Sequence, residues 1–450
     1  MRSLALGALA CMAACAAPPG AGVRGGQLRD DDGRALLLRG VNLSGRHRQP
    51  PYFDFHQPDD YARVYRDWGM DSIRFLVSWA AVEPERGSID EDYLAKVRER
   101  IGWAEAAGLL VVLDMHQAVF GEGFAGVGDG APRWACDEAR YAGFVAQQPW
   151  FVNDLDPRVI ACYDAFWASD ALQAEYAAAW AAVARAVGDS PAVVGFDPMN
   201  EPYFGSSVVD EFEAQRLAPF YVRVADAVRA ERPRWIAFLE PSAGRNLGFP
   251  TALPAGLMRD AMYAPHSYDL GAERGAGFAA AQRDGVIDNA RALRGEAGAR
   301  GLGLWIGEYG GDASDPAVAD YMAAELDGVG EAAAGAMYWE YRRDEGYGLL
   351  HEDGTEKTAL LDAMVRPYPE RVAGDPRRFA LDAEDRFTLE YAPDAEIVAP
   401  TILIAPTRRY PRGVDVDCGG CAARTEGQRV ILTTPPPVQD GVARVVLSPR

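Results

Sequence analysis

Two glutamates stand at the ends of apolar runs, where a fold of parallel strands places its chemistry. Glu201 follows Asn200 and precedes Pro202, and Glu308 lies at the end of the run Leu302–Tyr309. Two carboxyl groups can cleave a glycosidic bond, because one protonates the leaving oxygen while the other attacks the sugar or activates water. A gap of about 5 Å gives retention of configuration and a wider gap gives inversion. Since acidic pairs are common by chance, only the positions of Glu201 and Glu308 in the fold can indicate whether they form a catalytic pair.

Eight short apolar runs recur along the chain, separated by stretches with helical spacing. The runs are Ala35–Leu43, Ser72–Trp79, Leu109–His116, Val193–Glu201, Trp235–Pro241, Ala261–Tyr268, Leu302–Tyr309 and Ala336–Tyr341. The expected helices are Asp59–Trp68, Asp90–Ala107, Ala171–Val187, Gln215–Arg232 and Pro316–Gly328. Near-continuous apolar strands that alternate with helices are typical of a parallel sheet covered on both faces. The pattern predicts a (β/α)₈ barrel, in which the fourth and seventh strands face each other across the mouth.

Polar residues gather at the C-terminal ends of these runs. They are Asn42, Arg74, His116, Asn200, Glu201, His266, Tyr268, Glu308 and Trp339. One such residue alone is most often a satisfied structural group. Nine on one rim indicate an active site, because the loops at this end of a barrel carry its chemistry.

Two segments depart from the repeating pattern of the barrel, which we place at residues 23–365. Residues 117–170 are too long for an ordinary connection and are rich in aromatic residues, so we expect an insertion that forms either an apolar acceptor groove or a self-packed lid. Residues 366–450 hold short strand-like runs at Arg378–Tyr391, Ile397–Ala405 and Arg429–Thr434, which predict a small β-sandwich domain. It either braces the barrel or binds carbohydrate.

The first 22 residues are typical of an export leader. Arg2 precedes the apolar stretch Leu4–Ala10, and Met12-Ala13-Ala14-Cys15 resembles a bacterial lipoprotein box. We therefore expect an exported protein, either extracellular or held at a membrane through a lipidated Cys15. No later segment is apolar for long enough to form a transmembrane helix.

Four cysteines follow the leader, and an even number in an exported chain predicts disulfides. Three pairings exist, and nearness in sequence favours Cys136 with Cys162 and Cys418 with Cys421. The spacing of the second pair also permits zinc, but with no histidine nearby a metal site is the weaker interpretation.

The formal net charge of −21 limits the classes of molecule that the protein can bind. It argues against nucleic acid, because phosphate binding needs a basic surface. It also argues against electrostatic attraction to anionic lipid, so that any contact with a membrane surface must be apolar. We predict no cofactor and no metal, and we expect a monomer.

The ordered set of rim residues resembles the active site of glycoside hydrolase family 5. Further stretches narrow the similarity to endoglycoceramidases and related glycolipid glycosidases. They are Leu113–Gln117, Gly130–Trp134, Tyr263–His266 and Arg366–Gly374. The similarity runs from about Leu37 to Arg378.

That resemblance implies that Glu201 is the acid/base and Glu308 the nucleophile. Arg74 and Tyr268 would then bind Glu308 and keep it ionised, since a cation and hydrogen-bond donors favour the charged form. The surroundings of Glu201 should instead disfavour its charge, with His266 supplying part of that effect.

The remaining rim residues would bind the sugar. Asn200 is expected to bind the 2-hydroxyl, Trp339 to face the ring, and His116 and Asp114 to bind or support hydroxyl contacts. The chain departs from the endoglycoceramidase pattern in two places. Ala118 stands where those enzymes carry Asp, and Arg46 or Arg48 where they carry a sugar-binding Lys.

Because of these departures, the head group stays open between a glucosyl and a galactosyl linkage. The sequence predicts a retaining β-glycosidase that hydrolyses the sugar–lipid bond of glycosphingolipids. One alternative is an endo-β-glucanase or β-glucosidase that acts on glycosides without lipid. The other is a carbohydrate-binding barrel without activity.

Overall fold

The computed structural model of the protein describes residues 22–44 and 46–450. The expected leader and Cys15 lie outside these residues. In the part described, no helix is both long enough and apolar enough to cross a membrane.

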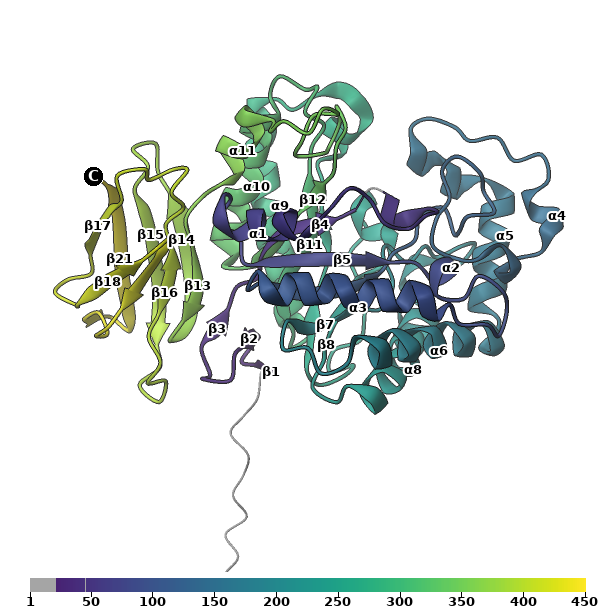
Figure 1. Ribbon diagram of the computed structural model, residues 1–450, viewed down its shortest axis with the longest axis horizontal. Coiled ribbons are helices and arrows are strands. Elements are labelled where there is room, and N and C mark those ends of the chain that lie inside the picture. Colours follow the sequence, from purple (N-terminus) through teal and green to yellow (C-terminus); the bar gives the residue numbers. More distant parts are fainter. Residues whose placement is uncertain (1–21, 45) are drawn as a thin grey trace, which may run out of the picture.

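Parallel strands close into a barrel, and the predicted (β/α)₈ fold is confirmed (Figure 1). The last strand pairs with the first, and the sixth position is shared by two short strands that both pair with the seventh. In order around the barrel the strands are β4 (Arg39–Leu43), β5 (Ser72–Val77), β6 (Leu110–Met115), β7 (Val193–Asp197), β8 (Ile236–Leu239), β9 (Ala261–Tyr263) with β10 (His266–Ser267), β11 (Gly303–Gly310) and β12 (Gly335–Tyr341).

Both faces of the barrel strands are buried, which explains their near-continuous apolar sequence. In β5 all six residues are buried. Ile73, Phe75 and Val77 pack outward into the core beneath the helices, while Val112, Phe238 and other side chains fill the interior. Because successive side chains alternate in direction, Arg74 points into the barrel.

Helices cover the outside of the barrel between its strands (Figure 1). They are α1 (Pro58–Arg66), α2 (Trp79–Val82), α3 (Glu91–Ala106), α6 (Asp170–Val187), α7 (Val209–Phe212), α8 (Ala218–Glu231), α9 (Arg283–Ala299), α10 (Val318–Ala332) and α11 (Thr358–Met364). Asp90 begins α3 by accepting a hydrogen bond from the Tyr93 amide, and Ser169 accepts one from the Leu172 amide at the start of α6. Such side chains satisfy amides that have no partner within the helix.

The floor of the barrel is shared with the C-terminal region. β1 (Gly22–Arg24), β2 (Gln27–Arg29) and β3 (Ala35–Leu36) continue into β13 (Tyr368–Val372), β16 (Ile402–Ile404), β19 (Arg429–Leu432) and β18 (Ala423–Glu426) as one sheet. The prediction of one continuous strand over Ala35–Leu43 is therefore wrong. Leu36, Leu37 and Leu38 are all buried although the chain passes from one sheet to the other there. The apolar sequence therefore gives no sign of the break between β3 and β4.

A second antiparallel sheet completes the predicted C-terminal β domain, which is confirmed. It contains β14 (Gly374–Leu381), β15 (Phe387–Pro393), β21 (Val442–Pro449), β17 (Val414–Asp417) and β20 (Val438–Gln439). β14 packs against α10, where Gly330 faces the carbonyl oxygen of Phe379 so closely that a side chain at position 330 would clash.

Residues 117–170 form η2 (Arg133–Ala135), α4 (Glu138–Tyr141), η3 (Trp150–Leu155) and α5 (Pro157–Trp167). Most aromatic residues here are buried, and Phe166 and Trp167 pack against Phe220 of α8. This region lies at the end of the molecule opposite to the C-terminal domain (Figure 1). Among the aromatic side chains of this region, Trp150 is exposed.

Both disulfides predicted from nearness in sequence are confirmed. Cys136 and Cys162 join the start of this region to α5, and Cys418 and Cys421 close a short turn in the C-terminal domain. The zinc alternative for the second pair is thereby wrong.

Removal of the Cys136–Cys162 bond should destabilise the protein, because the bond closes a chain separation of 26 residues. We expect the double variant Cys136→Ala, Cys162→Ala to lose about 3 kcal/mol of free energy of unfolding, measured by urea titration. The matched control Cys418→Ala, Cys421→Ala opens a separation of only 3 residues and should lose less. A larger loss in the control would contradict the prediction.

Candidate active site

The rim residues expected from the sequence meet at the C-terminal end of the barrel. Each one contacts at least one other through a hydrogen bond, an ion pair or a ring contact. Glu201 follows β7 and Glu308 lies in β11, and Arg74 of β5 and His266 of β10 contact them.

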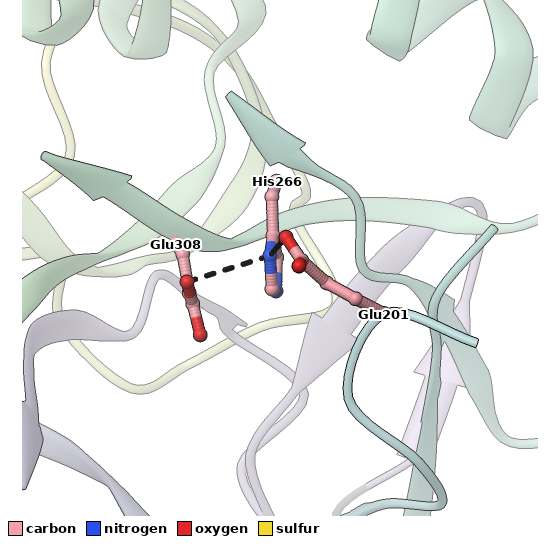
Figure 2. Close-up of side chains that lie close together, drawn as sticks. All are labelled: Glu201, His266 and Glu308. Atoms are coloured by element: carbon pink, nitrogen blue, oxygen red, sulfur yellow. Dashed lines mark hydrogen bonds and ion pairs between the residues drawn. The ribbon is translucent and has the colours of Figure 1, made fainter. Parts of the chain in front are cut away.

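One imidazole joins the two glutamates. Nδ1 of His266 lies 2.8 Å from Oε1 of Glu201 and 3.5 Å from Oε2 of Glu308 (Figure 2). One carboxylate oxygen from each glutamate lies within 4.8 Å of the other. The side chains of Glu201 and Glu308 therefore face each other across one site, at a short separation.

Glu308 is buried between a cation and a phenol. Nη1 of Arg74 lies 2.7 Å from its Oε1, and the hydroxyl of Tyr268 donates to its Oε2 at 2.9 Å. The expected contacts are thus present, but burial raises the pKa of Glu308 to about 7, although His266 and Arg74 pull it down. Arg74 favours the charged form of Glu308, as expected, but desolvation by burial outweighs this effect and leaves the pKa raised.

Glu201 shows the opposite balance. Burial raises its pKa, but the hydrogen bond and charge of His266, with further help from His116 and from Asn246, leave the pKa below its ordinary value. Nδ2 of Asn246 donates to Oε1 of Glu201 at 2.7 Å. The expectation that the surroundings of Glu201 disfavour its charge, with His266 supplying part of that effect, is therefore wrong.

His266 holds the proton that these carboxylates attract. Burial lowers the pKa of His266, but Glu240, Glu308 and Glu201 together raise it well above the ordinary value. Its Nε2 lies 3.1 Å from Oε1 of Glu240, so that a carboxylate faces each ring nitrogen. Since the pKa of Glu201 is lowered and an ionised carboxylate can only accept hydrogen bonds, the contact with Glu201 favours a proton on Nδ1 of His266.

The main chain at Glu201 is held in an unusual conformation. Its φ is +39°, a region that residues with side chains seldom adopt. The Glu201 amide donates to Oε2 of Glu240 at 2.8 Å, and Nε2 of Gln117 donates to the Glu201 carbonyl oxygen at 3.0 Å. These two contacts hold the backbone strain that aims the carboxyl group into the mouth.

Arg74 is the centre of the site and is fully buried. Its Nη2 lies 3.0 Å from Asp114, 2.8 Å from Asp197 and 2.9 Å from Glu240, in addition to the contact of Nη1 with Glu308. Burial raises the pKa of Asp114 to about 7, of Asp197 to about 6 and of Glu240 to about 8. At neutral pH the cluster therefore retains protons among its carboxyl groups.

Three residues of this site were missed from the sequence. Glu240 ends the fifth strand just before Pro241, so it repeats the pattern of Glu201 with Pro202 and could have been recognised. Asp197 also ends a strand. Asn246 carries no comparable signal, because it lies in the short helix η5 (Ala243–Leu247) beyond the fifth strand.

A second group of side chains surrounds Trp339. The ring of His116 stacks on the indole at 5.2 Å, and Nδ1 of His116 lies 2.8 Å from Asp114. The guanidinium of Arg48 lies 5.4 Å from the indole centre and pairs with Asp129 at 3.3 Å. This group offers donors, acceptors and an aromatic surface for sugar hydroxyls.

Asn200 has its side chain fixed by two contacts. Its Oδ1 accepts from Nη2 of Arg74 at 3.0 Å, and its Nδ2 donates to the carbonyl oxygen of Gln117 at 3.0 Å. Gln117 in turn accepts a hydrogen bond from the hydroxyl of Tyr163 on α5. The disulfide-bonded region thereby supports the segment that carries Glu201.

A cavity of about 530 Å³ lies above the barrel, between η3 and the loops that follow β10, β11 and β12. Its lining combines aromatic residues with acids, among them Trp150, Phe151, Glu273, Asp312 and Tyr347. The hydroxyl of Tyr347 donates to the carboxylate of Glu273 at 2.7 Å, and burial raises the pKa of Glu273 to about 7.

Glu201, His266 and Glu308 each place one potential metal ligand within 4.8 Å of the others. Both nitrogens of His266 already face carboxylates, and Arg74 and Tyr268 already bind Glu308. Contacts between the side chains themselves thus account for this grouping.

Comparison with known proteins agrees with this architecture. Residues 30–345 match the cellulase model of glycosyl hydrolase family 5, and residues 366–446 match the C-terminal domain of glycoside hydrolase family 5. Endoglycoceramidase I of Rhodococcus hoagii (strain 103S) is 28% identical, over 94% of this chain and 86% of its own.

Solved structures give the same relationship. Endo-glycoceramidase II from Rhodococcus sp., in its complex with ganglioside GM3, has a TM-score of 0.83 and 33% identity, and covers 94% of this chain and 99% of its own. A crystal structure of endogalactoceramidase has a TM-score of 0.75 at 23% identity, covering 96% and 100%, which is a likeness of fold. This chain is a member of glycosyl hydrolase family 5, a family of retaining glycoside hydrolases, and is related to endoglycoceramidases.

Proposed function

We propose that the protein is a retaining β-glycosidase that hydrolyses the linkage between sugar and lipid in glycosphingolipids. The observation that carries the proposal is the approach of Glu201 and Glu308, whose oxygens lie within 4.8 Å around one imidazole. Retaining enzymes use carboxyl groups about 5 Å apart, whereas inverting enzymes leave room for a water molecule.

In the first step the carboxylate of Glu308 attacks the anomeric carbon, the bond from that carbon to the leaving oxygen breaks, and Glu201 gives the oxygen a proton. In the second step Glu201 takes a proton from water, the water oxygen bonds to the anomeric carbon, and Glu308 is released. Both residues end in their starting forms.

His266 links the two events. Its Nδ1 lies 2.8 Å from Oε1 of Glu201, so a proton on Nδ1 can reach the leaving oxygen through Glu201. As Glu308 bonds to the sugar it loses its negative charge, and one of the charges that hold the proton on His266 disappears. The proton then moves more readily through Glu201 to the leaving oxygen, and the proton that Glu201 takes from water in the second step returns to His266.

The lipid part of the proposal draws on the relatives and on the cavity. Similar proteins include endoglycoceramidases and glucosylceramidases, and the cavity beside the site presents Trp150 and Phe151. Near Trp339, Arg48 and Asp129 supply a paired donor and acceptor for the sugar. These two residues are compatible with either a glucosyl or a galactosyl head group.

The proposal is tested by assaying fluorescent glucosylceramide and galactosylceramide glycans in detergent, beside cello-oligosaccharides and nitrophenyl β-glycosides. We expect the glycosphingolipids to have the highest kcat/KM. Activity confined to cello-oligosaccharides would assign the protein to the rival function, a β-glucanase.

Replacement of the nucleophile should abolish turnover, because the covalent step is lost. We expect Glu308→Ala to lower kcat on a nitrophenyl glycoside by about 10³-fold or more, with an unchanged circular dichroism spectrum. The control is Glu99→Ala on α3, whose carboxylate is exposed and distant from the site. Retention of activity in the Glu308 variant would refute its assignment.

Replacement of the acid should separate good from poor leaving groups. We expect Glu201→Ala to lose far more activity on glycolipids than on nitrophenyl glycosides, because nitrophenolate leaves without protonation. Added azide should restore the second step by attacking the glycosyl-enzyme, giving a glycosyl azide detectable by mass spectrometry. An equal loss for both kinds of substrate would count against the acid role.

The pH dependence should reflect the raised pKa of Glu308. Because the nucleophile must be ionised, and burial raises its pKa to about 7, kcat/KM should fall on acidification below about pH 7. An ordinary glutamate would retain its charge to about pH 4.3. The measurement is kcat/KM on a nitrophenyl glycoside from pH 4 to pH 9. An acidic limb centred below pH 5.5 would contradict this prediction.

A further inference from the structure

Large apolar side chains are exposed in one sector of the barrel mouth. Among the described residues nine such side chains are exposed, and six belong to three consecutive loops, those after β6, β7 and β8. We call these six the apolar rim: Val145, Trp150, Leu155, Val208, Leu247 and Phe249.

The three loops that carry the apolar rim contact one another. The Ser206 amide donates to Asp164 at 2.9 Å, and the indole nitrogen of Trp167 donates to the Tyr203 carbonyl oxygen at 2.8 Å, so the first and second loops are joined. Gly244 of the third loop lies directly against Val209, which follows Val208. Exposed apolar groups on adjoining segments differ from the scattered ones that every surface carries.

The apolar rim adjoins the acid of the proposed reaction. Glu201 follows β7, the middle strand of this sector. Asn246, which donates to Glu201, immediately precedes Leu247 of the rim. Trp150 belongs both to the rim and to the lining of the cavity. The rim therefore flanks the side of the site at which the leaving group departs.

The first loop of the rim is held in place by a disulfide and by side-chain hydrogen bonds. The Cys136–Cys162 bond anchors the first loop to α5. Asn153 accepts from the Gln147 amide and donates to the carbonyl oxygens of Gln147 and Trp150, which fixes the turn that carries Trp150. Exposed side chains held in this way lose little conformational freedom when they bind a surface.

The charge of the protein restricts what can cover this surface. With a net charge of −21, the chain is repelled by anionic lipids. Burial of apolar side chains in a lipid interface requires no opposite charge and is favourable by about 25 cal/mol for each Å².

We propose that the apolar rim docks the protein on a bilayer whose head groups are neutral or zwitterionic. The inference rests on the proposed function, because a glycosphingolipid is embedded in such a surface and must be reached there. Docking by the rim places the leaving-group side of the site against the bilayer while the sugar lies toward Trp339 and Arg48.

The test is co-sedimentation with phosphatidylcholine vesicles that contain no glycolipid. We expect the wild-type protein to bind them equally well in 0.1 M and 1 M NaCl, because apolar contacts are not screened by salt. The triple variant Leu155→Ser, Val208→Ser, Phe249→Ser removes one exposed side chain from each loop. It should bind about tenfold more weakly or worse.

The matched control replaces two exposed valines of the C-terminal domain. Val398 and Val438 are 96% and 55% exposed, and Val398→Ser with Val438→Ser should leave vesicle binding unchanged. Hydrolysis of a soluble nitrophenyl glycoside should be the same in the wild type, the triple variant and the control, since none of the altered residues contacts the catalytic groups.

Several results would overturn the proposal. They are a wild-type protein that does not sediment with vesicles, a triple variant that binds as well as the wild type, and binding abolished by 1 M NaCl. A wild-type dimer that the triple variant dissociates would assign the rim to a second copy of the chain instead. Vesicle binding without hydrolysis of glycosphingolipids in detergent would refute the proposed function and leave the docking surface standing.

Discussion

A single buried cation organises the mouth of the barrel. Arg74 has no exposed surface, and it lies within 3.0 Å of carboxyl groups from four other strand ends. Loss of this guanidinium would leave several acids without compensation in a place that water does not reach, which is strongly destabilising. The positions of Glu308 and of Glu240 therefore depend on one charge, and through Glu240 so does the backbone of Glu201.

Because so many carboxyl groups lie close together, the site determines which of them carries a proton as well as how much charge they carry. More carboxyl groups than cations share this space, so protons must remain among them at neutral pH. His266 lies between three of those carboxyl groups and carries the proton nearest to Glu201. Removal of one negative charge by bonding at Glu308 alters this balance at a distance of only 3.5 Å.

Apolar patterning predicted the barrel well, because strands buried on both faces have few alternative interpretations. The meeting of His116, Glu201, His266 and Glu308 followed from strand ends that lie on one rim. Arg74 instead lies in the middle of β5 and reaches the site because its side chain points into the barrel. The pattern could not reveal the bend at Leu36–Leu38, since all three residues are buried on either side of it. Nor could it rank the pKa values of Glu201 and Glu308, which depend on distances to His266 of 2.8 and 3.5 Å that no spacing encodes.

The chain enters the fold on the floor of the barrel. The Val23 amide donates to Asp260, just before β9, and Gly26 lies against the start of β11, so the first described strand is at the opposite end from the mouth. Any membrane tether attached upstream of Gly22 would join the protein at the end of the barrel opposite to the mouth. The mouth would then point away from the membrane that holds the tether. For the proposed docking of the apolar rim, the bilayer that the mouth meets would then be a different surface from the one that holds the tether.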